Sequence, residues 1–297
     1  MGNPNLNDPR KKFHTEKFPD QEQNTPALQN EMSPKPDCGE ESYKGHNRLE
    51  GRNALITGGD SGIGRAAAIA YAREGANVAI QFFPGEEEDA SEVKALIEEA
   101  GTKALLLPYD LREDGAATEM VKKTVEAFGG LDTLVLNAGQ QIAQPTLSDL
   151  TIKQVEDTFK VNIISMFEAV KAAEEHLEPG SAIITTTSVQ SYNPSTFLMD
   201  YASTKGAISN FTVNLSSYFA SKGVRVNGVA PGPIWTPLQL DNGQPDGKIP
   251  EFGQNAPLGR AGQPVELAPV YVLLASDEGS YITGQIYGVT GGEPIDL

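Results

Sequence analysis

Short runs of β-branched and aliphatic residues alternate with longer amphipathic segments from about residue 49 to the end of the chain. The apolar runs have the length and composition of buried strands and occupy 53–57, 77–82, 103–110, 131–139, 181–188, 224–232 and 285–292. Helical periodicity covers about 63–74, 86–100, 113–128, 149–176 and 202–221. This alternation predicts an α/β fold with a single Rossmann-like, doubly wound parallel sheet and helices on both of its faces.

Residues 1–45 do not follow this pattern. They are rich in Pro, Asn, Gln and charged residues and contain few large apolar side chains, so they cannot build a core of their own. Either this extension is disordered, or it is an ordered arm that lies on the body or on a neighbouring subunit. We therefore divide the chain into an irregular N-terminal extension, 1–45, and a Rossmann-fold domain, 46–297.

A second irregular segment lies at about 233–255, where Pro, Gly and Asn are frequent. We predict that it forms a loop over the substrate pocket, because binding residues are often carried on loops that a rigid scaffold positions. Trp235, at its start, either faces this pocket or anchors the loop by packing.

Composition excludes several classes of partner. The chain has 297 residues and a formal net charge of −17 with a pI near 4.6, which opposes binding to nucleic acid or to anionic membrane surfaces. One cysteine cannot form an internal disulfide, and three scattered histidines do not predict a metal site. We found no apolar run as long as a signal peptide or a membrane span, so we expect a cytoplasmic protein.

The first candidate for chemistry is the glycine-rich segment "TGGDSGIG" at 57–64, which lies between the first strand and the first helix. Glycines allow a tight turn and a close backbone approach, and the N–H groups at the start of the helix attract an anion. An ordinary loop is the alternative, but this position is the one that a phosphate-binding turn requires. We predict a dinucleotide pyrophosphate here, with contacts from Gly58, Asp60, Ser61, Gly62, Ile63 and Gly64.

The second candidate is "YASTK", in which Tyr201 and Lys205 lie one turn apart at the start of the predicted helix 202–221. Taken alone, this pair is more simply read as a boundary tyrosine and a solvated lysine.

Together, the motifs resemble the short-chain dehydrogenase/reductase family over nearly all of residues 50–292. They occur in the order of that family: "TGGDSGIG" at 57–64, Asp110, "NAG" at 137–139, Asn162, Ser188, "YASTK" at 201–205 and "PG" at 231–232. The extended N-terminus with "MSPKPDCGEESYKG" further resembles a bacterial subgroup labelled general stress or glucose/ribitol-type dehydrogenases.

The resemblance implies a catalytic role for four residues. Tyr201 would be the general acid/base, and Lys205 would stabilise its phenolate and bind the nicotinamide ribose, since a free tyrosine titrates near pH 10. Ser188 would donate a hydrogen bond to the substrate oxygen. Asn162 would hold a water molecule that links Lys205 to solvent.

The resemblance also implies the cofactor contacts. Asp110 would accept a hydrogen bond from the adenine amino group, and the segment after "PG" would reach the nicotinamide carboxamide or the phosphates. "NAG" and "PG" also suit ordinary turns. The full set of implied contacts outside the glycine-rich turn is Phe82, Asp110, Leu111, Asn137, Ala138, Gly139, Tyr201, Lys205, Pro231, Gly232, Ile234 and Thr236.

These contacts predict an NAD(P)-dependent oxidoreductase that interconverts an alcohol and a carbonyl by hydride transfer. The alternatives are a sensor or scaffold that binds cofactor with little turnover, and an epimerase or dehydratase of the extended branch of the superfamily. The substrate would be a small alcohol, aldehyde, ketone or polyol, selected by the loops at 140–146, 190–198 and 233–255. Enzymes that resemble this one are usually homotetramers, so we expect the same assembly.

The choice of dinucleotide depends on the end of the second strand. NAD-specific relatives carry an aspartate there, and NADP-specific relatives carry a nearby Arg or Lys, but this chain has Phe82, Phe83 and Ser61 at the corresponding positions. Because Asp60 and the acidic run from Glu86 would repel a 2′-phosphate, we favour NAD(H), with dual use as the second interpretation.

Overall fold

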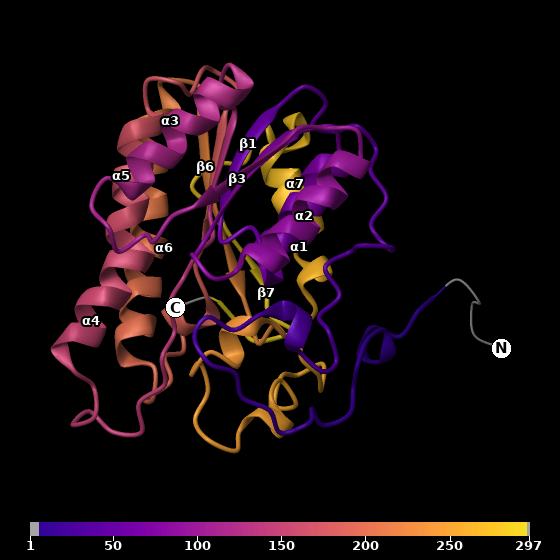
Figure 1. Cartoon of the computed structure of the whole chain (residues 1–297), viewed down its shortest axis with the longest axis vertical. Coiled ribbons are helices and arrows are strands. Elements are labelled where there is room, and N and C mark those ends of the chain that lie inside the picture. The colour runs from indigo at the N-terminus through magenta and orange to yellow at the C-terminus, as the bar shows by residue number, and fades with distance from the viewer. Residues whose placement is uncertain (1–5, 296–297) are drawn as a thin grey trace.

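The fold is organised around one parallel sheet with a layer of helices on each face (Figure 1). A computed structural model describes residues 6–295. All pairings between strands are parallel and follow the order β3-β2-β1-β4-β5-β6-β7. The predicted doubly wound α/β fold is confirmed. The strands are β1 Asn53–Thr57, β2 Asn77–Phe82, β3 Ala104–Pro108, β4 Thr133–Leu136, β5 Ala182–Thr186, β6 Arg225–Pro231 and β7 Ile286–Val289.

Each strand lies within the predicted run, but β3, β4, β5, β6 and β7 are shorter than predicted. The residues after these strands leave the sheet at its carboxyl edge instead of continuing the ladder. In an open parallel sheet this edge, at the point where the strand order reverses, is where ligands bind. The reversal here lies between β1 and β4, which are neighbours in the sheet.

The two helical layers bury separate apolar clusters against the sheet. In Figure 1, α1, α2 and α7 lie on one side and α3, α4, α5 and α6 on the other. The helices are α1 Gly62–Arg73, α2 Glu87–Glu99, α3 Ala116–Phe128, α4 Ile152–Phe159, α5 Ser165–Ala173, α6 Met199–Ala220 and α7 Ala268–Ala275.

Two helical features differ from the prediction. The helix expected at 149–176 is divided into α4 and α5 by a π-helical turn, Lys160–Ile164. Helix α7 was not predicted, because Ala268–Ala275 is apolar on all sides and has no amphipathic period to recognise. It is covered on its inner side by the sheet and by α1.

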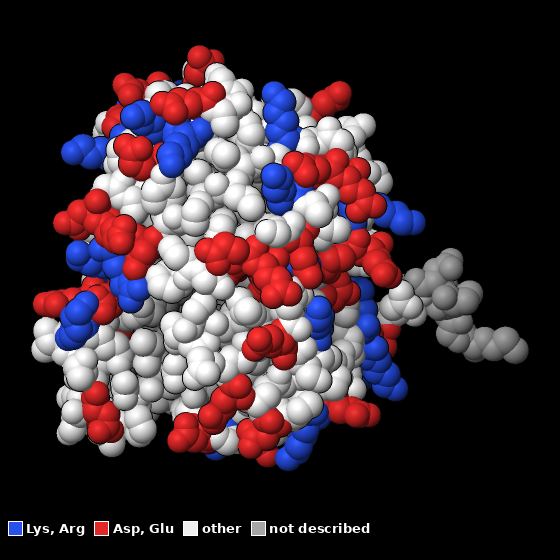
Figure 2. Space-filling model, in the orientation of Figure 1, with Lys and Arg blue, Asp and Glu red and all other residues white. Residues whose placement is uncertain are grey.

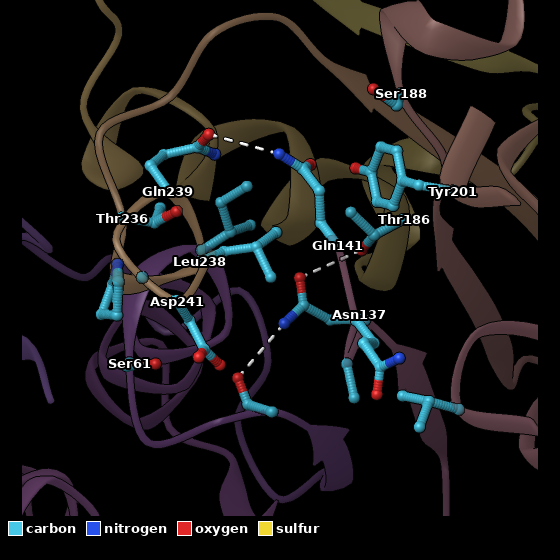
Figure 3. A pocket seen from close by; sticks show the side chains of 18 of the residues that line it. Ser61, Asn137, Gln141, Thr186, Ser188, Tyr201, Thr236, Leu238, Gln239 and Asp241 are labelled. Atoms are coloured by element: carbon cyan, nitrogen blue, oxygen red, sulfur yellow. Dashed lines mark hydrogen bonds between the residues drawn. The ribbon is translucent and has the colours of Figure 1, made fainter. Parts of the chain in front are cut away.

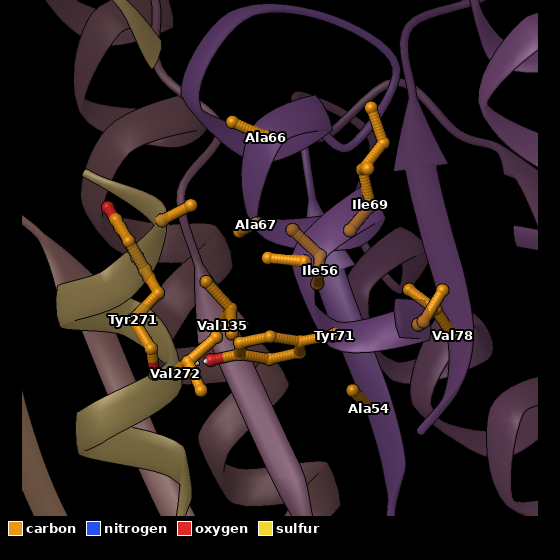
Figure 4. Packing of buried hydrophobic residues seen from close by; sticks show 14 of the residues in the cluster. Ala54, Ile56, Ala66, Ala67, Ile69, Tyr71, Val78, Val135, Tyr271 and Val272 are labelled. Atoms are coloured by element: carbon orange, nitrogen blue, oxygen red, sulfur yellow. Dashed lines mark hydrogen bonds between the residues drawn. The ribbon is translucent and has the colours of Figure 1, made fainter. Parts of the chain in front are cut away.

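Small residues on α1 allow this helix to approach the sheet closely, and Figure 4 shows Ala66 and Ala67 above Ile56. The hydroxyl of Tyr71 donates to the backbone carbonyl of Tyr271 at 3.0 Å, which ties α1 to α7. The packing of α1, which begins at the glycine-rich turn, is thereby fixed from two sides.

The described part of the N-terminal extension, residues 6–45, is an ordered arm that lies on the body. It contains two short 3₁₀ turns, Pro9–Lys11 and Gln29–Glu31, and otherwise runs as irregular chain beside the loop at 233–255 (Figure 1). Phe18 of the arm stacks on Trp235 with ring centroids 3.8 Å apart. Trp235 is therefore a packing anchor, at the centre of a third cluster with Phe18, Ala27, Met32, Leu240, Ile249 and Ala261.

Acidic side chains dominate the charged surface on the face shown in Figure 2, where they form patches with Lys and Arg side chains between them. This distribution agrees with the net charge of −17 and disfavours polyanionic partners. Within residues 6–295, we find no helix with the length and apolarity that crossing a membrane would require.

Candidate active site

A cavity of about 370 Å³ lies at the carboxyl edge of the sheet (Figure 3). It extends from the glycine-rich turn after β1 to Tyr201 on α6, and most of the residues predicted from the sequence line it. The predicted residues in its walls are Gly58, Asp60, Ser61, Gly62, Ile63, Asp110, Leu111, Asn137, Ala138, Gly139, Ser188, Tyr201, Lys205, Pro231, Gly232, Ile234 and Thr236.

The glycine-rich turn has the shape of an anion cradle. Gly62 begins α1 with a φ of +50°, a conformation that side chains disfavour. A Cβ atom on Gly64 would lie 1.8 Å from the carbonyl oxygen of Gly58, so this position excludes every larger residue. Ser61 does not cap the helix with its side chain, and the Gly62 N–H donates to Gln29, so a ligand can use the next N–H groups of the first turn, those of Ile63 and Gly64. A pyrophosphate fits this combination of close backbone approach and exposed donors.

Asn137 holds the turn in register with the neighbouring strands. Its Nδ2 donates to the carbonyl oxygens of Thr57 and Gly58 at 3.2 Å each, and its Oδ1 accepts from Thr186 at 3.2 Å. The "NAG" segment is therefore a tie between β1 and β5 as well as a wall of the cavity.

At the other end of the cavity, α6 and the end of β5 bring Ser188, Tyr201 and Lys205 together. All three are buried, and Figure 3 shows the Tyr201 hydroxyl pointing into the cavity beside Gln141. The Lys205 Nζ donates to the backbone carbonyl of Thr186 at 2.9 Å and lies 5.2 Å from the centroid of the Tyr201 ring. The Ser188 Oγ accepts from the backbone N–H of Gln190 at 3.1 Å, so its hydroxyl proton is free to be donated elsewhere.

Burial dominates the ionisation of this pair. It raises the pKa of Tyr201 to about 12, against a smaller opposing effect of the hydrogen bond with Ser188. It lowers the pKa of Lys205 to about 7, because the ammonium loses its hydration. The protein alone therefore does not provide the lowered tyrosine pKa that the resemblance implies.

Asn162 lies in the π-helical turn and is completely buried. Its Nδ2 donates to the Gln140 carbonyl and to the Thr204 hydroxyl at 3.0 Å each, and its Oδ1 accepts from the Gln140 N–H at 2.7 Å. These bonds clamp the loop after β4 to α6, beside Lys205. In this structure the Asn162 side chain is engaged by protein groups, and Asn162 is not among the residues that line the cavity.

The end of the cavity beyond the glycine-rich turn differs from the prediction at Phe82. Side chains alternate along a strand, so Phe82 points with Val78 and Ile80 into the core under α1 and α2, away from the cavity. Phe83 lines the cavity instead, with the Arg112 guanidinium 5.1 Å from its ring centroid. Gly64 also lies outside the cavity walls, and its role is to allow the contact with Gly58.

Charged groups at this end are mostly acidic. Asp110 pairs with Arg112 at 2.6 Å, and their hydrogen bonds lower the pKa of Asp110. Asp60 and Glu86 both line the cavity, and burial raises the pKa of each carboxyl group; repulsion by Asp89 adds to the shift at Asp60, and repulsion by Asp60 adds to the shift at Glu86. Arg65 points away, because it pairs with Glu40 at 3.0 Å and with Glu92 at 3.1 Å.

Among the cavity residues that sequence reasoning missed, two groups bear most on the function. One is Thr25, Pro26 and Ala27 of the arm, for which the local sequence gave no signal. The other is a set of carboxamides near Tyr201, which fall in or beside the loops predicted to select the substrate. They are Gln140, Gln141, Gln190, Gln239 and Gln244.

Comparison with known proteins identifies the family. Residues 58–293 match a family model described as enoyl-(acyl carrier protein) reductase. An uncharacterized oxidoreductase of Bacillus subtilis is 58% identical over 297 residues, which is 99% of each chain. The chain belongs to the short-chain dehydrogenase/reductase family. The resemblance seen in its motifs is thereby confirmed, and the protein is an oxidoreductase of this family.

Two further members of the short-chain dehydrogenase/reductase family extend the comparison. A glucose and ribitol dehydrogenase of Daucus carota is 42% identical and covers 94% of this chain and 98% of its own length. A short chain dehydrogenase from Burkholderia cenocepacia, solved in complex with NADP, aligns with a TM-score of 0.77 and 33% identity over 83% of this chain and 99% of the other. The first agrees with the glucose/ribitol-type subgroup, and the second gives no support to the preference for NAD(H).

Proposed function

We propose that the protein is an NAD(P)-dependent oxidoreductase that interconverts an alcohol and a carbonyl group, with Tyr201 as the general acid/base. The observation that carries this proposal is a single cavity that joins an anion cradle to the buried cluster of Ser188, Tyr201 and Lys205. A nicotinamide dinucleotide bound along this cavity would supply or accept the hydride.

Tyr201, Lys205 and Ser188 would each have a separate role in transferring a proton to the substrate. With its pKa at about 12, Tyr201 keeps its proton at neutral pH and can donate it to a carbonyl oxygen during reduction. Lys205, oriented by the Thr186 carbonyl, would stabilise the resulting phenolate in its ammonium form. Ser188 would donate its free proton to the same substrate oxygen, where negative charge develops.

The test is to titrate the protein with NADH and NADPH and then to follow oxidation of the reduced nicotinamide with a panel of aldehydes and ketones. Binding with turnover is the expected result. Binding without turnover on the whole panel would favour a sensor or scaffold instead. Interconversion of substrate without net change of the dinucleotide would favour an epimerase or dehydratase.

For the substrate, we infer a neutral, hydroxylated aldehyde, ketone or polyol. Gln141, Gln239 and Gln244 form a hydrogen-bonded series on one side of the cavity, and uncharged amides can both donate to and accept from hydroxyl groups. A site built to bind hydroxyls rejects analogues that lack them. We therefore expect a higher kcat/KM for glyceraldehyde than for propanal, and equal values would contradict the inference.

For the dinucleotide, we propose dual use, with Arg112 as the residue that admits a 2′-phosphate. Within residues 6–295, the cationic side chains that line the cavity are Lys205 at the tyrosine end and Arg112 at the opposite end. Asp60, Glu86 and Asp110 surround that opposite end, and they favour the ribose hydroxyls of NAD(H). Arg112→Ala should lower kcat/KM for NADPH and leave that for NADH nearly unchanged. An equal loss with both dinucleotides would rule out this role.

For assembly, we propose a homotetramer in the cytoplasm, with α5 and α6 in a subunit interface. Ile164, Phe167, Val213 and Tyr218 are large, exposed apolar or aromatic residues in or beside these two helices. Burial of such a surface is favourable and is typical of subunit contacts. Light scattering should give the mass of four chains, whereas a stable monomer would contradict the proposal.

A further inference from the structure

The arm is bonded directly to the glycine-rich turn. The Gln29 Oε1 accepts from the backbone N–H of Gly62 at 2.8 Å, and the Cys38 Sγ donates to the carbonyl oxygen of Gly62 at 3.4 Å. Gln29 and Cys38 are both buried, and the Gln29 Nε2 lies 3.4 Å from the Cys38 Sγ. Gln29 and Cys38 of the arm thus bind the N–H and the carbonyl of Gly62, the residue at which α1 begins.

The same arm reaches the cavity and the loop that covers it. Thr25, Pro26 and Ala27 line the cavity, and the Thr25 hydroxyl donates to the carboxylate of Asp241, which Figure 3 shows near Ser61. Further along the arm, the carbonyl of Pro34 accepts from the Trp235 indole N–H at 2.8 Å. The arm therefore connects the glycine-rich turn with the loop at 233–255 and completes the wall between them.

We propose that arm residues 25–29 are part of the dinucleotide site, with Gln29 as a positioning residue for the glycine-rich turn and Thr25–Ala27 as a wall of the pocket. This inference rests on the proposed function. A glycine at φ +50° has many alternative conformations, so a turn that is fixed before the ligand arrives loses less entropy on binding. Gln29 provides that restraint at Gly62, whose N–H would otherwise have to find another partner.

A purely structural arm is the competing explanation, because Phe18 and Met32 also complete the cluster around Trp235. The two explanations differ in what the loss of one polar side chain should change. A structural arm would affect stability and leave ligand affinity unchanged. An arm that positions the turn would change the affinity for ligands that carry a pyrophosphate, and it would leave adenosine affinity unchanged.

The experiment measures the Kd of ADP, adenosine and NADH by calorimetry on the full chain. Gln29→Met removes the acceptor while keeping the length of the side chain. Gln21→Met is the matched control, because Gln21 also bonds backbone groups, at Ser33 and Pro19, but only within the arm. We expect the Kd of ADP and NADH to rise about tenfold in Gln29→Met, as loss of one buried hydrogen bond suggests. Adenosine affinity in this variant, and all three affinities in Gln21→Met, should stay within twofold of wild type.

A second variant covers the case in which Gln29→Met fails to fold. Thr25→Val keeps the shape of an exposed side chain and removes the bond to Asp241, and it should raise the Kd of NADH about threefold. The proposal is overturned if ADP and NADH bind to folded Gln29→Met as to wild type, if Gln21→Met shows the same loss, or if Thr25→Val leaves NADH affinity unchanged. If wild type binds neither NADH nor NADPH, the proposed function itself fails and the role of the arm falls with it.

Discussion

Replacing Tyr201 by Phe removes a single oxygen atom from the site while keeping the ring in place. Phe lacks only the hydroxyl and its polar interaction with Ser188, and losing one such interaction costs no more than about 1 kcal/mol of stability. The variant should therefore fold and keep its cavity. Because the hydroxyl is assigned to proton transfer and not to the cofactor, the Kd of the dinucleotide should stay close to that of wild type.

The expected loss of rate follows from the ionisation of this group. With its pKa at about 12, nearly every Tyr201 is protonated at pH 7, so in the reducing direction almost all molecules carry the acid that Phe cannot replace. A positioned general acid contributes about 10²–10⁴-fold in rate, and turnover should fall by that factor. In the oxidising direction the phenolate is required, so the wild-type rate should rise with pH.

The assay follows reduced nicotinamide in single-turnover and steady-state reduction of a carbonyl substrate. Tyr281→Phe makes the same chemical change at a fully exposed residue that does not line the cavity, and it should keep wild-type rates. If folded Tyr201→Phe turns over within tenfold of wild type, Tyr201 is not the proton donor and the mechanism is wrong.

Further outcomes follow from the arm, the acidic pair and the lysine. Phe18→Ala should lower the free energy of unfolding by about 3–5 kcal/mol in denaturant titrations, because Phe18 is buried against Trp235; a loss below about 1 kcal/mol would contradict this packing. The raised pKa values of Asp60 and Glu86 contribute stability at low pH that is lost as the pH rises above about 4, so melting temperatures should fall from pH 5 to pH 8, and less so in Glu86→Gln. Lys205→Ala should weaken both turnover and dinucleotide binding. If the Kd of the dinucleotide stays unchanged, Lys205 does not bind the ribose.

The sheet could be predicted because its strands are buried on both faces and are therefore continuous apolar runs. Its order also explains why motifs far apart in sequence meet: parallel strands present all their carboxyl ends at one edge, where Asn137, Ser188 and Gly232 follow β4, β5 and β6. The break at Lys160–Ile164 could not be predicted, because the reason for it is not local. Asn162 binds Gln140 and Thr204 from that turn, and the periodicity of one segment carries no information about such partners.

The arm shows why composition alone was insufficient. Phe18, Ala27, Met32 and Cys38 are separated by polar and proline-rich sequence, and a segment with so few apolar residues cannot bury enough surface by itself. Composition reports only the apolar surface that a segment can bury against itself, and not the surface that it can bury against the rest of the chain. Here the missing partner is Trp235, which lies about two hundred residues later and is fully buried, with Phe18 of the arm stacked on its ring. Since the covered loop and the glycine-rich turn both form walls of the cavity, the segment whose composition least suggested a structure completes the site.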